Sequence, residues 1–318
     1  EERPGGAARC CGSQITTWCK ASEGPPPCRY YGGKAKPLPT IELQLLGMFN
    51  AGTNLLRQLL LLNSPLADCS ARDREGESFL CLGTAALAPP AIWKHTPPTD
   101  PFLSEFLRKP YHAVVAMVRA PLAQIASWRK EPYSLRSFTP NGRPNCLSGN
   151  RSIAKVEAKR CLLPYHLPPH NNSDLTYTMP GKLFEVQGVT GLWNFYTAGY
   201  EGLPQFAASH GSRAFVVEYE ALLLQPEETI TRLIRELSLH PPEAFTAVEG
   251  KTKMHGRPVK RTAAVDRLIH RRYLGNFDGD GELAALCRGL DLRLAATHMV
   301  PVAGHRTSYS SDCEGGAW

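Results

Sequence analysis

The sequence contains no long hydrophobic run, since none of its apolar stretches reaches the roughly 18 residues that a membrane-spanning helix needs. Its 10 cysteines include no Cys-x2-Cys pair, so zinc binding is less expected than disulfide bonding. Charge is also modest, with 20% charged residues and a formal net charge of +7. What remains is an ordinary globular composition, and 318 residues that are 42% hydrophobic can bury a sizeable core.

The cysteines and two glycosylation sequons together indicate an oxidising compartment. Four cysteines crowd the start of the chain: Cys10, Cys11, Cys19 and Cys28. Asn-x-Ser sequons occur at 150–152 and 171–173, in a polar, proline-rich stretch that should be a surface loop. The sequence begins at Glu1 instead of methionine. We therefore expect a disulfide-bonded glycoprotein whose signal peptide or membrane anchor has been removed, working in the secretory lumen, as in the Golgi, or outside the cell.

Composition divides the chain into an arm and a body. Residues 1–39 are rich in Cys, Gly and Pro and are expected to form a disulfide-pinned arm with little regular structure. Residues 40–318 form the expected domain. Between about 130 and 180 its pattern dissolves into Pro, Asn, Ser and basic residues, which we interpret as a long surface insertion.

Short apolar runs alternate with helical periodicities along the body. Expected strands cover 40–47, 91–95, 112–119 and 213–220, and expected helices cover 51–63, 121–130, 182–210 and 226–239. The run HAVVAMVR at 112–119 is typical of a parallel strand that is buried on both faces. Strands separated by helices predict an α/β fold with a central, mainly parallel sheet.

The segment LLGMFNAGTNLLRQLL, residues 45–60, reads as a strand, a tight turn and a helix. Gly47 and Gly52 have the G-x4-G spacing of a phosphate loop, where backbone N–H groups and a helix N-terminus can hold an anion. A nucleotide hydrolase needs lysine and then Ser or Thr after the second glycine, whereas this chain has Thr53 and Asn54. The loop is therefore suited to a phosphate without a metal-bound triphosphate. A glycine-rich turn that binds nothing is the alternative.

A second candidate anion motif follows the 112–119 strand. Arg119 ends this strand, Pro121 suits the first turn of the next helix, and Ser127 lies two turns further on. An arginine at the carboxyl end of a parallel strand points into the crevice where α/β sheets bind ligands. An ordinary strand-end cation and a small packing residue are the alternative reading.

Together the two motifs resemble the sulfotransferase family, which uses 3′-phosphoadenosine 5′-phosphosulfate as donor. The resemblance covers about residues 41–130 and 182–240, and it implies a three-layer α/β/α, P-loop-like sulfotransferase architecture. It implies that the first loop binds the 5′-phosphosulfate and that the second motif, Arg119 and Ser127, binds the 3′-phosphate, with no metal. The loop residues that carry the first role are Asn50, Ala51, Gly52, Thr53 and Asn54.

One position departs from the family pattern. The family usually has lysine or arginine where this chain has Asn50, two residues before the second glycine. That cation stabilises the leaving group, and its loss could cost a few orders of magnitude in rate. Lys94 or Arg57 is the expected substitute. The departure also keeps open a non-catalytic protein that binds the nucleotide or an anionic glycan.

The acceptor needs a general base with a pKa near neutrality. His95 is our candidate because it closes the expected 91–95 strand and should open into the same crevice, and family members place a catalytic histidine there. A glutamate such as Glu75 or Glu77 is the rival, since carbohydrate-modifying members use one. The expected acceptor is a hydroxyl or amine, such as that of a glycan or small molecule, and no nucleic-acid partner is expected.

A basic stretch, KTKMHGRPVKRT at 251–262, follows the last clear helix. Family members close a late basic loop over the 3′-phosphate, so Arg257, Lys260 and Arg261 are candidate cofactor-binding residues. A solvated basic loop is the alternative. A phosphotransferase that uses ATP or GTP is disfavoured by the missing lysine and by the lack of a clear aspartate-bearing Walker strand.

Overall fold

The fold is described from a computed structural model. The described residues are 41–69, 78–82, 92–132, 135–136, 145–148, 153–164, 183–248, 260–277, 281–302 and 305–314. The expected arm at 1–39, both sequons, Arg257 and the rival glutamates Glu75 and Glu77 lie outside them.

The described chain is a mixed α/β fold around a five-stranded sheet with strand order β2-β3-β1-β4-β7. The strands are β1 (Ile41–Gly47), β2 (Ala67–Asp68), β3 (Phe79–Leu82), β4 (His112–Val118) and β7 (Arg213–Glu218). β4 lies parallel to both β1 and β7, whereas β3 is antiparallel to β1 and β2 is antiparallel to β3. The α/β class is thus confirmed, but the sheet is mixed.

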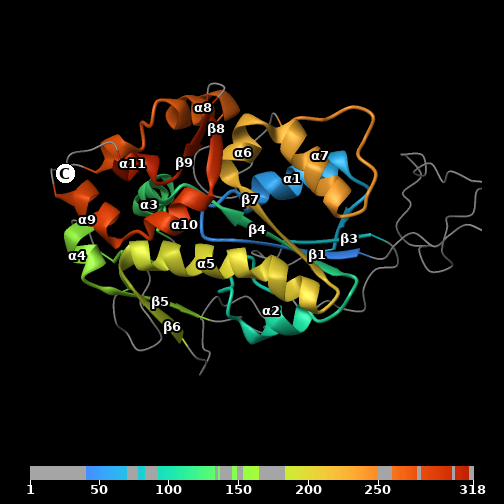
Figure 1. Ribbon diagram of the computed structural model, residues 1–318, viewed down its shortest axis with the longest axis horizontal. Helices are drawn as coiled ribbons and strands as arrows, with labels where there is room; N and C mark the ends of the chain where they lie inside the picture. The colour runs from blue at the N-terminus through green and yellow to red at the C-terminus, as the bar shows by residue number, and fades with distance from the viewer. Residues whose placement is uncertain are drawn as a thin grey trace, which may run out of the picture.

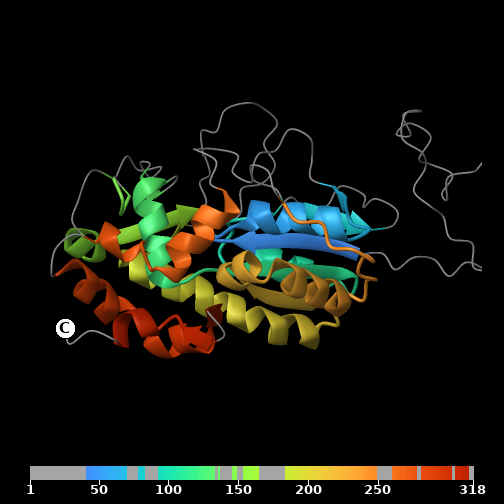
Figure 2. The same cartoon turned by 90° about the horizontal axis from the view of Figure 1, so that it is seen from above.

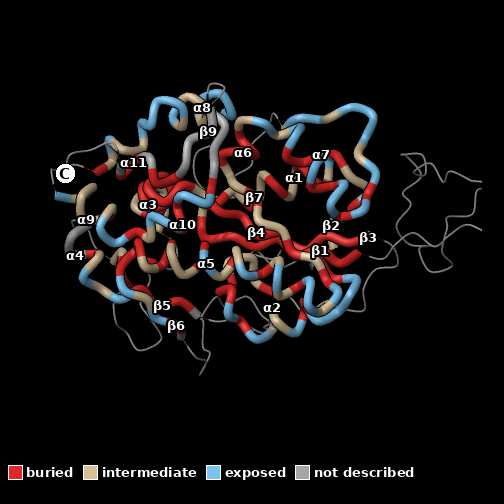
Figure 3. Tube along the Cα trace, in the orientation of Figure 1, coloured by how far each residue is buried: buried red, intermediate tan, exposed pale blue. Residues whose placement is uncertain are grey.

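Helices cover both faces of this sheet (Figure 1). α1 (Thr53–Asn63), α6 (Tyr219–Leu224) and α7 (Pro226–Glu236) lie on one face, and α2 (Pro101–Phe106) and α5 (Gly188–Ser209) lie on the other. Every residue of β1 and β4 is buried, as the tube in Figure 3 shows in red, because both faces are covered. β7, expected to be equally buried, is the last strand of the sheet and is only partly buried.

The expected strand at 91–95 is wrong. Only Trp93 forms an isolated bridge, and the Thr96 N–H donates to the Trp93 carbonyl at 2.9 Å, so the chain turns there. The segment still reaches the sheet, because the Gly47 N–H donates to the Lys94 carbonyl at 2.8 Å. The strand that pairs with β1 on this side is β3 instead. A disulfide between Cys69 and Cys81 links β3 to the end of β2.

The expected insertion contains regular structure that the sequence did not indicate. α4 (Ile153–Glu157) and β5 (Arg160–Pro164) lie within it, and β5 pairs antiparallel with β6 (Leu183–Gln187). A second disulfide joins Cys146 to Cys161. The expected 182–210 helix is wrong at its start, where β6 forms, but from Gly188 onward α5 runs unbroken for 22 residues with Pro204 inside it.

The C-terminal segment lies beyond the carboxyl ends of β1, β4 and β7, where α3 (Pro121–Lys130) also lies (Figures 1 and 2). Its elements are α8 (Arg261–Ile269), η2 (Leu274–Asn276), α9 (Glu282–Gly289), α10 (Leu292–Thr297), β8 (Met299–Val302), β9 (His305–Ser308) and α11 (Ser311–Glu314). A third disulfide, between Cys287 and Cys313, ties α11 to α9. The far end of the chain therefore packs around the sheet edge at which the two candidate motifs end.

The three disulfides are compatible with a secreted or lumenal protein. Within the described residues, no helix has the length and apolar character needed to cross a membrane.

Candidate functional site

The loop between β1 and α1 has an unusual backbone. Asn50 has φ 63° and Gly52 has φ 98°, so both occupy the left-handed region, which glycine and asparagine tolerate best. Such left-handed residues turn successive backbone N–H groups toward a common concave side, which is the geometry of an anion-binding nest. The sequence-based interpretation of a tight strand-to-helix turn is confirmed.

Close packing against neighbouring side chains is enough to explain why residues 47 and 52 are glycines, whether or not the loop binds a ligand. A Cβ atom on Gly47 would lie 2.8 Å from the Thr53 methyl carbon, and a Cβ atom on Gly52 would overlap the ring of Tyr219. The loop is therefore pressed between β1 and the first residue of α6, and neither glycine can be replaced without moving a neighbour.

The loop's carbonyl groups are turned toward β4 and α3. The Phe49 carbonyl accepts from Gln124 Nε2 at 2.5 Å and from Trp128 Nε1 at 2.8 Å, and the Asn50 carbonyl accepts from Arg119 Nη1 at 3.0 Å. In a planar trans peptide the N–H points opposite to the C=O. The Asn50 N–H accordingly faces away from α3, and α1 begins without a side-chain cap on its first N–H groups.

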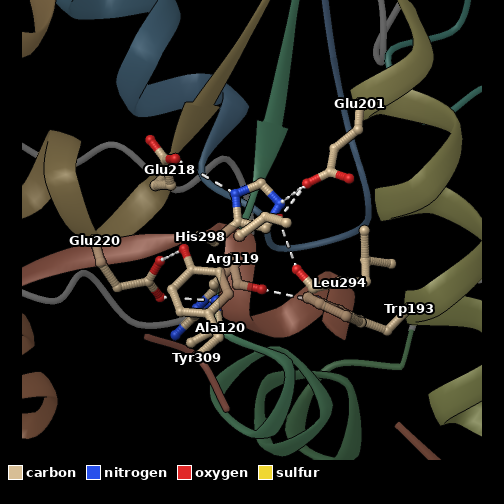
Figure 4. Close-up of polar contacts among 10 residues, drawn as sticks. Arg119, Ala120, Trp193, Glu201, Glu218, Glu220, Leu294, His298 and Tyr309 are labelled. Carbon is tan, nitrogen blue, oxygen red and sulfur yellow. Dashed lines mark hydrogen bonds and ion pairs between the residues drawn. The ribbon is translucent and has the colours of Figure 1, made fainter. Parts of the chain in front are cut away.

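Arg119 brings the two candidate motifs into direct contact. Its guanidinium bonds the Asn50 carbonyl, lies 4.7 Å from the centre of the Tyr219 ring, and leaves a buried Nε with no partner among the described residues. A buried donor without a partner is costly, so an acceptor at this point would stabilise the site. The Arg119 backbone carbonyl accepts from Trp193 Nε1 at 2.8 Å (Figure 4).

A buried carboxylate balances Arg119. Glu220, on α6, accepts from the Ala120 N–H at 3.1 Å and from the Tyr309 hydroxyl (Figure 4). Burial raises the pKa of Glu220, and the Arg119 charge opposes that rise. Through Tyr309 and Glu220, the C-terminal segment is thus linked to Ala120, the residue that follows Arg119.

A second polar group lies beside this contact. The ring of His298 is buried between Glu201, 3.0 Å from Nε2, and Glu218, 3.4 Å from Nδ1, and it stacks on Tyr309 with ring centres 5.4 Å apart (Figure 4). Burial acts to raise the pKa of Glu218, but the hydrogen bond with His298 holds it below its usual value. This group ties α5, β7 and the C-terminal segment together.

His95 lies directly beside the loop. Its Nδ1 is 2.6 Å from the Gly47 carbonyl, so Nδ1 carries the proton and Nε2 has the lone pair. Its ring centre is 4.5 Å from that of Phe49 and 5.2 Å from that of Trp93. Burial, together with the Lys94 charge, lowers the pKa of His95 from 6.5 to about 3, so the imidazole is neutral at pH 7.

The cation candidates differ in placement. Lys94 Nζ donates to Asn54 Oδ1 at 3.2 Å and so lies at the first turn of α1, beside the loop. Arg57, the other suggested substitute, forms an ion pair with Asp68 instead. The Asn50 side chain itself points toward α3, because its Nδ2 donates to the Glu131 carbonyl at 3.1 Å.

Three expected residues remain: Ser127 lies on α3, and Lys260 and Arg261 lie at the start of α8. Ser127 is the first residue of α3 that is partly exposed. Lys260 and Arg261 are exposed at the start of α8, and Arg261 donates to the Leu223 and Leu224 carbonyls at the end of α6. Arg261 thus satisfies a helix C-terminus, and no described contact brings it or Lys260 to the loop.

Three side chains that contact the loop or Arg119 were not predicted from the sequence: Gln124, Trp128 and Tyr219. A polar glutamine within the apolar run PLAQIASW was the available signal, since a buried polar side chain needs a partner. Among the described residues, no group of three or more His, Cys, Asp or Glu side chains could hold a metal ion.

No protein-family model, no curated protein and no solved structure matches this chain. Function must therefore be argued from the loop, Arg119 and His95 themselves.

Proposed function

We propose that this chain is a sulfotransferase of P-loop-like architecture, which moves a sulfuryl group from 3′-phosphoadenosine 5′-phosphosulfate to a hydroxyl or amine, such as that of a glycan. The observation that carries the proposal is the hydrogen bond between Arg119 and the Asn50 carbonyl. It joins two anion motifs that lie 69 residues apart in sequence. A nest and a neighbouring arginine suit a ligand with two separate anionic groups, as this donor has.

Each part has a role in the proposed reaction. The loop N–H groups and Thr53 hold the 5′-phosphosulfate, and Arg119 and Ser127 hold the 3′-phosphate. Lys94, at the start of α1, supplies the cation that Asn50 does not. Its charge stabilises the bridging oxygen as the leaving group departs.

Proton transfer is assigned to His95. The acceptor oxygen or nitrogen forms a bond to sulfur, the bond from sulfur to the bridging phosphate oxygen breaks, and Nε2 takes the acceptor's proton. 3′-Phosphoadenosine 5′-phosphate leaves with the electron pair of the broken bond. A pKa of about 3 makes the free imidazole a weak base, but a bound polyanion favours the protonated form and raises that pKa.

The donor site is tested by thermal stabilisation with 3′-phosphoadenosine 5′-phosphate, with ADP and Mg-ATP as controls. Wild type should be stabilised selectively, and Arg119→Ala should abolish the shift. Arg213→Ala is the matched control, because Arg213 also donates to a backbone carbonyl, that of Glu236, but at the amino end of β7. An equal shift with Mg-ATP, or none, would overturn the proposal.

A non-catalytic protein that binds the nucleotide or an anionic glycan is the second candidate. Two observations favour it: Asn50 is turned toward the Glu131 carbonyl, and His95 is a weak base. Binding of 3′-phosphoadenosine 5′-phosphate without turnover of the donor by any acceptor would decide for this candidate. For either candidate we propose a place in the secretory pathway, such as the Golgi, and the three disulfides are compatible with it.

A further inference from the structure

One backbone carbonyl in the loop receives two side-chain hydrogen bonds from α3. Gln124 Nε2 and Trp128 Nε1 both donate to the Phe49 carbonyl, at 2.5 Å and 2.8 Å. Both side chains are completely buried, with 0% of each exposed. The two residues are four apart, so they lie on one face of the helix. Both lone pairs of the carbonyl are thereby used.

No other described contact accounts for a buried glutamine amide at this point of α3. The Gln124 amide makes its hydrogen bond to the loop, while its buried Oε1 has no partner among the described residues. A buried glutamine with one unmatched oxygen is unfavourable as simple packing, because a nonpolar side chain of similar size would avoid that cost. The amide therefore serves the loop.

We propose that Gln124 and Trp128 are positioning residues of the anion loop. By holding the Phe49 carbonyl against α3, they direct the Asn50 N–H to the opposite side, where the 5′-anion of the donor would bind. This inference rests on the proposed function. They follow Arg119 by five and nine residues, so a single helix fixes the loop directly and carries Ser127 of the other anion motif.

The role predicts a loss that depends on the ligand's 5′-phosphate. Gln124→Met and Trp128→Phe each remove one donor and keep most of the side-chain volume. Losing one hydrogen bond of this kind should weaken binding of 3′-phosphoadenosine 5′-phosphate by roughly 2- to 12-fold. Adenosine 3′-monophosphate, which lacks the 5′-phosphate, should bind with unchanged affinity, whereas a general loss of structure would weaken both ligands.

The double variant sharpens the test. The two donors share one acceptor, so either alone still orients the carbonyl in part, and the double variant should lose more than the product of the single losses. Ser212→Ala is the control for a lost buried donor, because its hydroxyl donates to the Ala207 and Leu107 carbonyls near the amino end of β7. It should lower the melting temperature without changing either affinity.

Calorimetric titration of both nucleotides on wild type and the four variants separates the outcomes. Selective loss for the 5′-phosphorylated ligand, larger than additive in the double variant, is the expected result. Equal losses for both nucleotides, or affinities unchanged like those of Ser212→Ala, would overturn the positioning role while leaving the proposed function standing. A wild type that binds neither nucleotide would overturn the proposed function and this inference with it.

Discussion

Two histidines stand at opposite ends of the same sheet, and they are bound differently. His95 lies at the carboxyl end of β1, and His112 begins β4 at the other edge. In each ring Nδ1 lies close to a backbone carbonyl, at 2.6 Å from Gly47 for His95 and 2.7 Å from Phe106 for His112. The rings differ at the second nitrogen. His112 Nε2 lies 2.6 Å from a Glu42 carboxylate oxygen, whereas no described residue bonds Nε2 of His95.

Only one of the two rings has a nitrogen that the described fold does not use. His112 is 1% exposed, and its ring also stacks on Phe106, so both nitrogens and one face are used by the fold. His95 is partly exposed and keeps one nitrogen for a ligand, next to the loop. Carboxyl ends of parallel strands are where α/β sheets bind ligands. Under the proposed function, His95 is therefore the histidine that takes part in the reaction, whereas His112 contributes to stability.

Replacing His95 should have the largest effect, and that effect should be on turnover. His95→Asn keeps a donor for the Gly47 carbonyl but removes the free ring nitrogen, so sulfuryl transfer should fall by about 10²- to 10⁴-fold. Affinity for 3′-phosphoadenosine 5′-phosphate should stay close to that of wild type. Transfer rates and calorimetric affinities check this, and unchanged turnover would remove His95 from the mechanism.

The corresponding substitution at the amino end of β4, His112→Asn, should lower stability and not turnover. His112→Asn leaves the Glu42 carboxylate buried without its partner, so the free energy of unfolding should fall by about 1–3 kcal/mol. The folded fraction should retain its turnover. Urea unfolding together with rates per folded molecule measures both, and a stability equal to wild type would mean that the buried pair contributes nothing.

Acid should weaken the fold through His95. Burial lowers the pKa of its ring from 6.5 to about 3, so the unfolded chain takes up a proton first as pH falls. The stability that the neutral ring contributes is complete above pH 6.5 and is lost progressively down to about pH 3. In His95→Asn this acid loss should be shallower. Urea unfolding at pH 7.5, 6 and 5 tests the slope, and identical slopes would contradict a neutral His95 ring in the folded state.

The smallest expected effect concerns the charge beside His95. Lys94→Met removes a cation that lowers the pKa of His95, so that pKa should rise while staying below 6.5, because burial remains. His112, whose lowering cation is Lys109, should titrate as before. Proton NMR of the histidine ring signals separates the two residues. A fall in the His95 pKa, or a matching change at His112, would contradict the assigned electrostatics.

The parts of the fold that the sequence predicted are those whose pattern is local. The buried runs of β1 and β4 and the periodicities of α1, α3 and α7 match the expected segments closely. β3 was missed because a strand of four residues depends on its partner β1, which pattern alone cannot identify. The 91–95 run was misread as a strand because apolar residues before Thr96 also suit a turn that packs against the sheet.

Only part of the candidate site could be predicted from the sequence. The sequence predicted that Arg119 and the loop open into one crevice, since both follow strands that were expected to be parallel and are so in the structure. The partners of the Phe49 carbonyl could not, because Gln124 and Trp128 lie 75 and 79 residues away and bond a backbone atom. Side-chain bonds to a distant main chain leave no periodicity or motif to read.

The most direct test of the central claim is transfer of labelled sulfate from 3′-phosphoadenosine 5′-phosphosulfate to a panel of glycans and small hydroxyl and amine acceptors. Released 3′-phosphoadenosine 5′-phosphate is measured in the same reaction, for wild type, Arg119→Ala and His95→Asn. Wild type should give labelled acceptor and equimolar released nucleotide, and each variant should lose both. Tight nucleotide binding with an intact donor and no labelled acceptor would contradict an enzyme and leave a binding protein.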